Sequence, residues 1–204
     1  MKPNGVLIRV VDDDNSFRTA IARFLRASGF EVKAYAAAAE FLADPSVETP
    51  GCVLLDLEMP QLSGLDLQDA LTKADIRLPV VFVSGQGDIP KTVLAMRRGA
   101  EDFLTKSCSR EVLLEAIHRA VARDATERQT RARLHELQAK LEELTERERE
   151  VLRHVVQGRL NKQIAADLGI HERTVKLHRT HLTTKLEVRS VAELTRLVQE
   201  AGFR

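Results

Sequence analysis

Short apolar runs alternate with amphipathic segments over the first 108 residues of the chain. The runs are rich in β-branched residues, and the third and fourth are nearly continuous, which is typical of strands buried on both faces of a sheet. The predicted strands are 6–11, 30–35, 52–56, 79–84 and 102–105. Apolar residues three and four positions apart predict intervening helices over 15–28, 36–43, 64–74 and 89–98. This alternation predicts a doubly wound α/β fold of five strand–helix units around a parallel sheet.

A long segment without glycine or proline follows, from Ser109 to about Glu143, and keeps a helical pattern throughout. We expect one continuous helix of roughly 35 residues, about 50 Å long at the helical rise per residue. Its middle, residues 123–131, is polar on every side. Near its end a leucine seam has 3-4-3 spacing and consists of Leu134, Leu137, Leu141 and Leu144. The seam has two interpretations that do not exclude each other: docking on the following domain, or pairing in a dimeric coiled coil.

The last 60 residues show the pattern of short helices only. Thr145 and Glu148 form a capping box in front of an apolar run, and Gly158 and Gly169 each end a helix. The predicted helices cover 146–157, 161–168, 172–185 and a last segment from Ser190. A short turn with glycine joins the second and third, which is the spacing of a helix-turn-helix. The α/β domain is thus expected to continue through a long helix into an all-α domain of four helices.

Charge divides the chain into unlike halves. The whole chain has 31 Lys+Arg and 30 Asp+Glu, a formal net charge of +1, which by itself points neither to nucleic acid nor to a membrane surface. Residues 1–125 carry 15 basic and 18 acidic residues, whereas 126–204 carry 16 and 12, and 151–190 alone carries 8 and 3. An acidic first half and a basic second half indicate two domains with different partners.

Signals for export or membrane insertion are weak in this sequence. The chain begins without the long apolar stretch of a signal peptide, and no run approaches the length of a membrane span. Two cysteines cannot form a framework of several disulfides. We therefore expect a cytoplasmic protein with reduced thiols and no membrane partner.

Polar residues follow the predicted strands at their carboxyl ends. Asp12 and Asp13 follow the first strand, Asp56 ends the third, Ser84 ends the fourth and Lys106 follows the fifth. In a doubly wound sheet these ends meet at one edge, where ligands bind. Several converging carboxylates are kept ionised by a hard divalent cation, and Mg²⁺ suits them best. With Asp56 as nucleophile and Lys106 and Ser84 facing the transferred group, such a site forms an aspartyl phosphate.

The predicted helix 172–185 has one apolar and one basic side. Its inward face has spacings of 3, 4 and 4 and consists of Val175, His178, Leu182 and Leu186. The opposite face carries Lys176, Arg179, Thr180 and Thr183. A helix of this kind fits the major groove of DNA, where Lys and Arg meet guanine edges or phosphates.

Four motifs of the first half resemble the receiver domains of two-component response regulators, which have a flavodoxin-like fold. The motifs are VVDDD (10–14), LLDLEMPQLSG (54–64), VVFVSG (80–85) and RRGAEDFLTK (97–106). The resemblance implies that Asp56 accepts the phosphoryl group and binds Mg²⁺ together with Asp12, Asp13 and the backbone carbonyl of Glu58. It further assigns a switch hydroxyl, a switch aromatic and a phosphate-binding lysine to Ser84, Phe103 and Lys106. Asp14 has no role in that pattern.

One departure concerns the residue after Lys106. Receiver domains usually have a proline there, often after a cis bond, but this chain has Ser107. A cis bond without proline costs about 3–4 kcal/mol. The loop is therefore expected to be trans and reshaped, or strained, with Lys106 less firmly placed and phosphorylation rates altered. A separate hypothesis is that Glu58 or Gln86 sets the lifetime of the phosphoryl group.

Three segments of the second half resemble the helix-turn-helix domain of LuxR/NarL-type regulators. They are LTEREREVL (144–152), NKQIAADLGI (161–170) and TVKLHRTHLTTKL (174–186). The resemblance implies that the last helix mediates dimerisation on DNA. It assigns base or backbone contacts to Lys176, Leu177 and Thr180, and phosphate contacts to Lys162 and Arg179. His171 stands at a helix start where the family usually has serine, so a side-chain cap there is in doubt.

Together these features are similar to the NarL/FixJ family of response regulators, with FixJ- and StyR-like members nearest. The expected domains are a receiver over 1–122, a helical linker over 123–143 that continues the fifth receiver helix, and a DNA-binding domain over 144–204. The family implies that a sensor histidine kinase phosphorylates Asp56, which promotes homodimerisation and control of transcription. Activation is the favoured outcome, and RNA polymerase is a possible further partner.

Two other functions compete with this interpretation. An aspartate-nucleophile phosphohydrolase would use the same Mg²⁺ pocket, but the sequence lacks a second acidic group placed as general acid/base just after Asp56. A binding module that works without phosphate, with a vestigial pocket, gains some weight from Ser107. Under the favoured interpretation the protein is not an enzyme beyond assisting its own phosphorylation and dephosphorylation.

Overall fold

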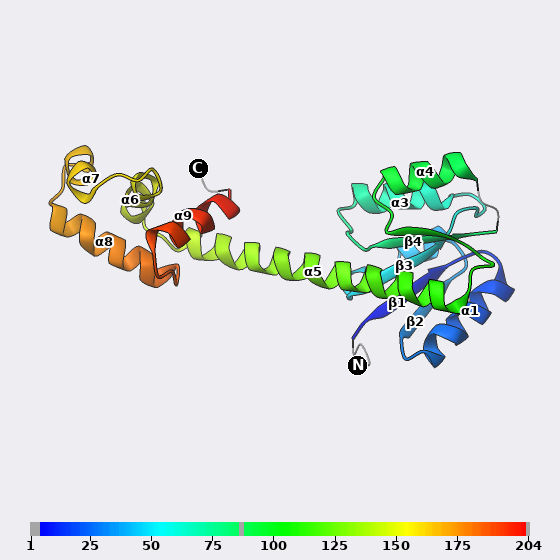
Figure 1. Cartoon of the computed structure of the whole chain (residues 1–204). Helices are drawn as coiled ribbons and strands as arrows, with labels where there is room; N and C mark the ends of the chain where they lie inside the picture. Colours follow the sequence, from blue (N-terminus) through cyan, green and yellow to red (C-terminus); the bar gives the residue numbers. More distant parts are fainter. Residues whose placement is uncertain (1–4, 86–87, 203–204) are drawn as a thin grey trace. The chain divides into compact units, whose positions relative to one another are not determined.

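The computed structural model describes residues 5–85 and 88–202, which form two compact units divided between Arg128 and Gln129 (Figure 1). The first unit contains a parallel sheet with the strand order β2-β1-β3-β4-β5. Its strands are β1 Leu7–Val11, β2 Glu31–Tyr35, β3 Gly51–Asp56, β4 Val80–Ser84 and β5 Asp102–Thr105. The prediction of a doubly wound α/β fold is confirmed.

Helices cover both faces of this sheet. They are α1 Asn15–Ala27, α2 Ala38–Leu42, α3 Gly64–Lys73, α4 Ile89–Arg97 and α5 Arg110–Glu142. One core joins α1 and α5 to the sheet through Leu25, Leu113 and Ile117, and the other joins α2, α3 and α4 through Phe41, Leu67 and Ala95. Successive residues of β3 alternate between the two cores, which explains why this strand is apolar throughout. A 3₁₀ helix, η1 Pro45–Glu48, was not predicted.

A buried arginine lies in β1, an interior strand of the sheet. Arg9 is fully buried, and its guanidinium donates to the carbonyl oxygens of Leu7 (3.1 Å), Thr49 (2.7 Å) and Ser46. Burial lowers the pKa of Arg9, although nearby Tyr35 opposes this effect. A buried charge is tolerated only with partners of this kind, because desolvation is otherwise costly. Arg9 therefore ties η1 to the sheet.

Asp124 of α5 is buried in the same region. Its carboxylate accepts hydrogen bonds from the Gly51 N–H (2.8 Å) and from Arg128 Nε (2.8 Å), and Arg128 also donates to the Glu48 carbonyl. Gly51 has φ +148°, and a Cβ there would lie 1.9 Å from the Leu7 carbonyl oxygen. Within residues 123–131, a stretch that is polar on every side in the sequence, Asp124 is therefore buried, and it belongs to the first unit, which extends to Arg128.

We expect Asp124→Ala to destabilise the first unit by about 2–4 kcal/mol, because it leaves the Gly51 N–H and the Arg128 guanidinium without their buried acceptor. The matched control is Glu127→Gln, three residues after Asp124 on α5, which alters an exposed ion pair with Arg123. This change should cost less than about 0.5 kcal/mol. Urea unfolding followed by circular dichroism measures both. Equal stability of the two variants would contradict a structural role for Asp124.

The second unit consists of the end of α5 and four short helices. These are α6 Glu146–Val156, α7 Asn161–Leu168, α8 Glu172–Lys185 and α9 Val191–Glu200, as the periodicity predicted to within about two residues. Leu141 and Leu144 of the leucine seam are buried in the core of this unit, and Leu134 and Leu137 are half-buried. The docking interpretation of the seam is thereby confirmed for its last two leucines, and coiled-coil pairing stays a prediction.

Glu148 connects α6 to the end of α8. Its carboxylate accepts hydrogen bonds from the Thr145 N–H (2.9 Å), which completes the predicted capping box, and from Lys185 Nζ (2.7 Å). The side chain is buried, and His181 Nδ1 lies 3.7 Å from it. Burial alone would raise the pKa of Glu148, but the hydrogen bonds from Lys185 and Thr145 outweigh it and hold this pKa below its ordinary value.

The lowered pKa of Glu148 predicts a pH dependence of stability. The contribution of the ionised carboxylate is complete above its unfolded pKa of about 4.3 and is lost as the pH falls through the folded value. We expect Glu148→Gln to cost about 1–3 kcal/mol at pH 7, with a gap to the wild type that narrows toward pH 3. Thermal unfolding across this range tests the prediction. Glu150→Gln, two residues along the same helix, changes a surface ion pair with Arg147 and is the control, which should cost less than about 0.5 kcal/mol at pH 7.

Candidate functional site

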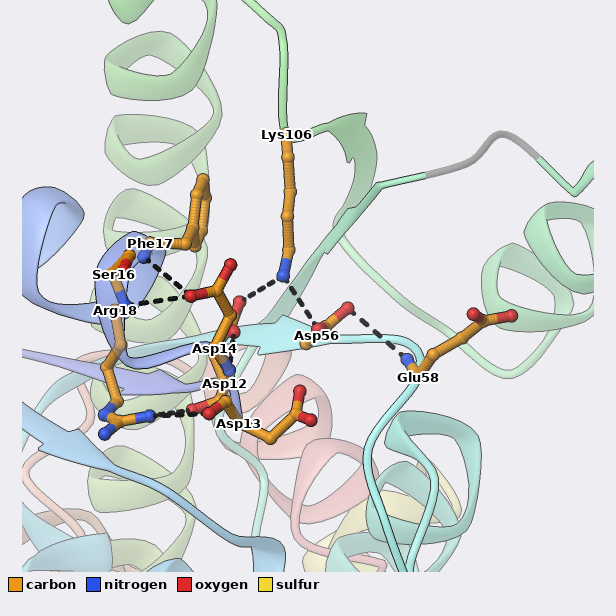
Figure 2. A network of polar contacts seen from close by, with 9 residues as sticks. All are labelled: Asp12, Asp13, Asp14, Ser16, Phe17, Arg18, Asp56, Glu58 and Lys106. Atoms are coloured by element: carbon orange, nitrogen blue, oxygen red, sulfur yellow. Dashed lines mark hydrogen bonds and ion pairs between the residues drawn. The ribbon is translucent and has the colours of Figure 1, made fainter.

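Three carboxylates converge at the carboxyl edge of the parallel sheet (Figure 2). Asp12 and Asp13 follow β1 and Asp56 ends β3, and carboxylate oxygens of all three lie within 4.8 Å of one another. Asp12 and Asp56 are buried, and Asp13 is exposed. The structure therefore brings together the acidic residues that the sequence placed at separate strand ends.

Lys106 lies between the two buried carboxylates. Its Nζ is 2.8 Å from Asp12 Oδ2 and 2.8 Å from Asp56 Oδ2. The Lys106 N–H also donates to the Ser84 carbonyl at 2.7 Å, which joins the ends of β4 and β5. The Lys106–Ser107 peptide bond is trans, one of the two outcomes expected in the absence of proline. Lys106 nevertheless reaches the carboxylates directly.

The electrostatics of the pocket follow from this arrangement. Burial raises the pKa of Asp12, and the neighbouring Asp56 carboxylate adds to this effect while Lys106 opposes it. Burial by itself would lower the pKa of Lys106, but its bonds to Asp12 and Asp56 raise it above the ordinary value. The lysine is therefore charged at neutral pH. Asp13 adds a third carboxylate, and oxygen ligands this close suit a hard cation such as Mg²⁺.

Backbone N–H groups hold the carboxylates of Asp12 and Asp56 in place through hydrogen bonds. The Asp14 N–H donates to Asp12 Oδ1 (2.8 Å), and the Glu58 N–H donates to Asp56 Oδ1 (3.3 Å). Gly64, the first residue of α3, packs so closely that a Cβ would lie 2.2 Å from the Asp56 carbonyl oxygen. Only glycine permits this approach of α3 to the end of β3.

Asp14 has a structural role that the sequence analysis did not assign. Its carboxylate is the N-cap of α1 and accepts hydrogen bonds from the N–H groups of Ser16 (2.8 Å) and Phe17 (3.3 Å). The available signal was an aspartate directly before an amphipathic helix, which is a preferred N-cap. Arg18 of the same helix donates to the Asp12 carbonyl at 2.6 Å.

The residues expected to respond to phosphorylation lie on β4 and β5. Ser84 is buried at the end of β4 and pairs in register with Thr105 of β5. Phe103 is half-buried and stacks on Phe82, with ring centroids 6.0 Å apart. The Glu58 side chain is exposed and forms an ion pair with Lys91 of α4 at 2.8 Å. Gln86 lies outside the described residues.

Helix α8 has the predicted two faces. Val175 and Leu182 are fully buried, Leu186, just after the helix, is 2% exposed and His178 is half-buried. Lys176, Leu177 and Thr180 are exposed on α8, as is Lys162 on α7. Arg179 is half-buried and donates to Asn161 Oδ1 at 3.0 Å, which joins α8 to α7. His171 precedes α8 without a side-chain cap hydrogen bond, so the doubt about that cap is confirmed.

Fold and site together define a receiver domain followed by a helix-turn-helix domain. Residues 8–118 match the family described as response regulator receiver domain, and residues 142–198 match the bacterial regulatory proteins of the luxR family. The chain belongs to the response regulators that carry a luxR-type DNA-binding domain. None of the described helices is long and apolar enough to cross a membrane.

Individual relatives extend over nearly the whole chain. The response regulator protein TmoT of Ectopseudomonas mendocina is 42% identical and is matched over 98% of this chain and 90% of that protein. The transcriptional regulatory protein FixJ of Rhizobium meliloti is 37% identical, with 96% of each chain covered. Among solved structures, the response regulator StyR is 43% identical with a TM-score of 0.87, over 96% of this chain and 99% of that chain.

Proposed function

We propose that this response regulator is switched by phosphorylation of Asp56 and that the switched form binds DNA as a dimer. The observation that carries the proposal is the convergence of Asp12, Asp13, Asp56 and Lys106 at one sheet edge, in a chain that also contains a luxR-type domain. A sensor histidine kinase is the phosphoryl donor that the receiver domain implies.

The donor set of the pocket fits Mg²⁺. Carboxylates of Asp12, Asp13 and Asp56 would hold the ion together with the backbone carbonyl of Glu58, and the ion would neutralise charge on phosphoryl oxygens. An Asp56 carboxylate oxygen attacks phosphorus, an oxygen–phosphorus bond forms, and the nitrogen–phosphorus bond of the kinase phosphohistidine breaks. The Lys106 ammonium, now 2.8 Å from Asp56, faces the incoming oxygens.

The added charge acts on groups at the same edge. Ser84 would donate its hydroxyl to a phosphoryl oxygen, and Phe103 would move toward the space that opens beside β4. Such a change has a distant effect only if two conformers lie within a few kcal/mol of each other. We further propose that Glu58 or Gln86 sets the lifetime of the phosphoryl group, which would require Glu58 to leave Lys91.

The face of α4, β5 and α5 is the proposed receiver dimer surface. Helix α4 exposes Ile89 (76%), Val93 (50%) and Met96 (43%), an apolar set that pairing would remove from water. The second domains would then pair through α9 and bind two half-sites on DNA. The half-sites would lie about one helical turn of the duplex apart, or a multiple of that distance. The proposal also includes activation of transcription, contact with RNA polymerase and a cytoplasmic location.

The two competing functions explain less of the molecule. A phosphohydrolase accounts for the acidic pocket but gives no role to the exposed basic face of α8. A phosphate-independent module accounts for α8 but not for a lysine held between two buried carboxylates.

Phosphorylation of Asp56 is tested with acetyl phosphate and Mg²⁺, by mass spectrometry of the modified residue and by light scattering. We expect the wild type to gain one phosphoryl group and to double its mass in solution, because phosphorylation reshapes the face of α4, β5 and α5 so that two receivers pair through it. Asp56→Asn should do neither. Asp75→Asn, a change at an exposed carboxylate, is the control and should behave as the wild type. Dimerisation of Asp56→Asn would favour the phosphate-independent module, and steady turnover of a phosphate ester would favour the phosphohydrolase.

The DNA contacts are tested by fluorescence anisotropy on a duplex that the wild type selects from a random pool, and on a scrambled duplex. Lys176→Ala should cost about 1–3 kcal/mol on the selected duplex and relax sequence preference, because a base contact carries discrimination. Lys162→Ala should weaken binding to both duplexes and reduce the salt slope by about one, because a phosphate contact releases a counterion. Identical losses on both duplexes for both variants would contradict these assignments.

A further inference from the structure

An aromatic ring from α1 lies against the lysine of the phosphorylation pocket. Lys106 Nζ is 4.7 Å from the centroid of the Phe17 ring. The same ammonium is 2.8 Å from Asp12 and from Asp56 (Figure 2). The lysine is therefore in contact with the ring and with both buried carboxylates at once.

The position of Phe17 is fixed by its own surroundings. Its N–H donates to Asp14 Oδ1 at the start of α1, and its half-buried side chain packs on the core between the sheet, α1 and α5. Lys106, by contrast, reaches the pocket on a flexible four-carbon stem from the loop after β5. A rigid ring beside a flexible cation restricts where the cation can lie.

The contact is favourable because a cation is attracted to the face of an aromatic ring, and the attraction grows when water is excluded. The Lys106 side chain is only 20% exposed, so this condition is met in part. The two carboxylates alone would leave the ammonium free to follow either of them. The ring adds a contact that keeps the stem on the α1 side of the pocket.

We propose that Phe17 is a positioning residue for phosphorylation, which holds the Lys106 ammonium over Asp56 through a cation–π contact. The effect on phosphorylation rests on the function proposed above, whereas the contact itself does not. The competing explanation is that Phe17 only fills the core. The chain offers a matched control in Phe24, which lies two turns further along α1, is also half-buried and packs on the same core.

The contact is tested first, in protein without Mg²⁺ or phosphoryl donor. In protein labelled with ¹³C-lysine, the Lys106 methylene signal, assigned by its loss in Lys106→Arg, should be shifted upfield by the ring. Phe17→Leu should abolish this shift, whereas Phe17→Tyr and Phe24→Leu should retain it. An unchanged Lys106 signal in Phe17→Leu overturns the proposal.

The consequence is tested by the rate of Asp56 phosphorylation with acetyl phosphate and Mg²⁺. Phe17→Leu should slow the reaction about three- to tenfold, the factor that corresponds to an ordinary cation–π contact. Phe17→Tyr should restore the rate to within about twofold, and Phe24→Leu should leave it unchanged. Equal rates for Phe17→Leu and the wild type, or equal slowing in Phe24→Leu, overturn the positioning role. Failure of the wild type to be phosphorylated would instead contradict the proposed function and leave the spectroscopic result standing.

Discussion

The bridge from Lys106 to Asp12 and Asp56 is the interaction on which the chemistry of the first unit depends. The three residues come from the ends of β5, β1 and β3, and they meet because all strands of the sheet run parallel. Two buried carboxylates side by side repel each other, and the ammonium between them removes much of that cost. Under the proposed function, the same ammonium would meet the oxygens of a phosphoryl group at Asp56. The arrangement of the pocket thus depends on one side chain.

Buried charge recurs away from the pocket and is satisfied there mainly by backbone groups. Arg9 donates to carbonyls around η1, and Asp124 accepts from the Gly51 N–H and from Arg128. These hydrogen bonds give partners to backbone N–H and carbonyl groups that neither a strand nor a regular helix would satisfy. They also explain why the receiver unit extends along α5 as far as Arg128.

Among its described residues, the second unit keeps its charged side chains at least partly exposed, with one exception. Val175 and Leu182 anchor α8 in the core, which leaves Lys176, Leu177 and Thr180 exposed. Glu148 is the buried exception, and it joins the cap of α6 to Lys185 at the end of α8. The net charge of +1 is therefore the sum of an acidic first part of the chain and a basic second part.

The sequence alone determined the order, type and approximate bounds of nearly all elements, because periods of 2 and 3.6 depend only on near neighbours. It also placed Asp12, Asp56 and Lys106 at strand ends, and its motifs indicated the family. It did not reveal that Asp124 is buried against Gly51, 73 positions away, or that Phe17 contacts Lys106. A local pattern treats Asp124 as a solvated helix residue and Phe17 as a core residue. Only tertiary structure decides such contacts, because their partners are distant in sequence and meet once the sheet has formed.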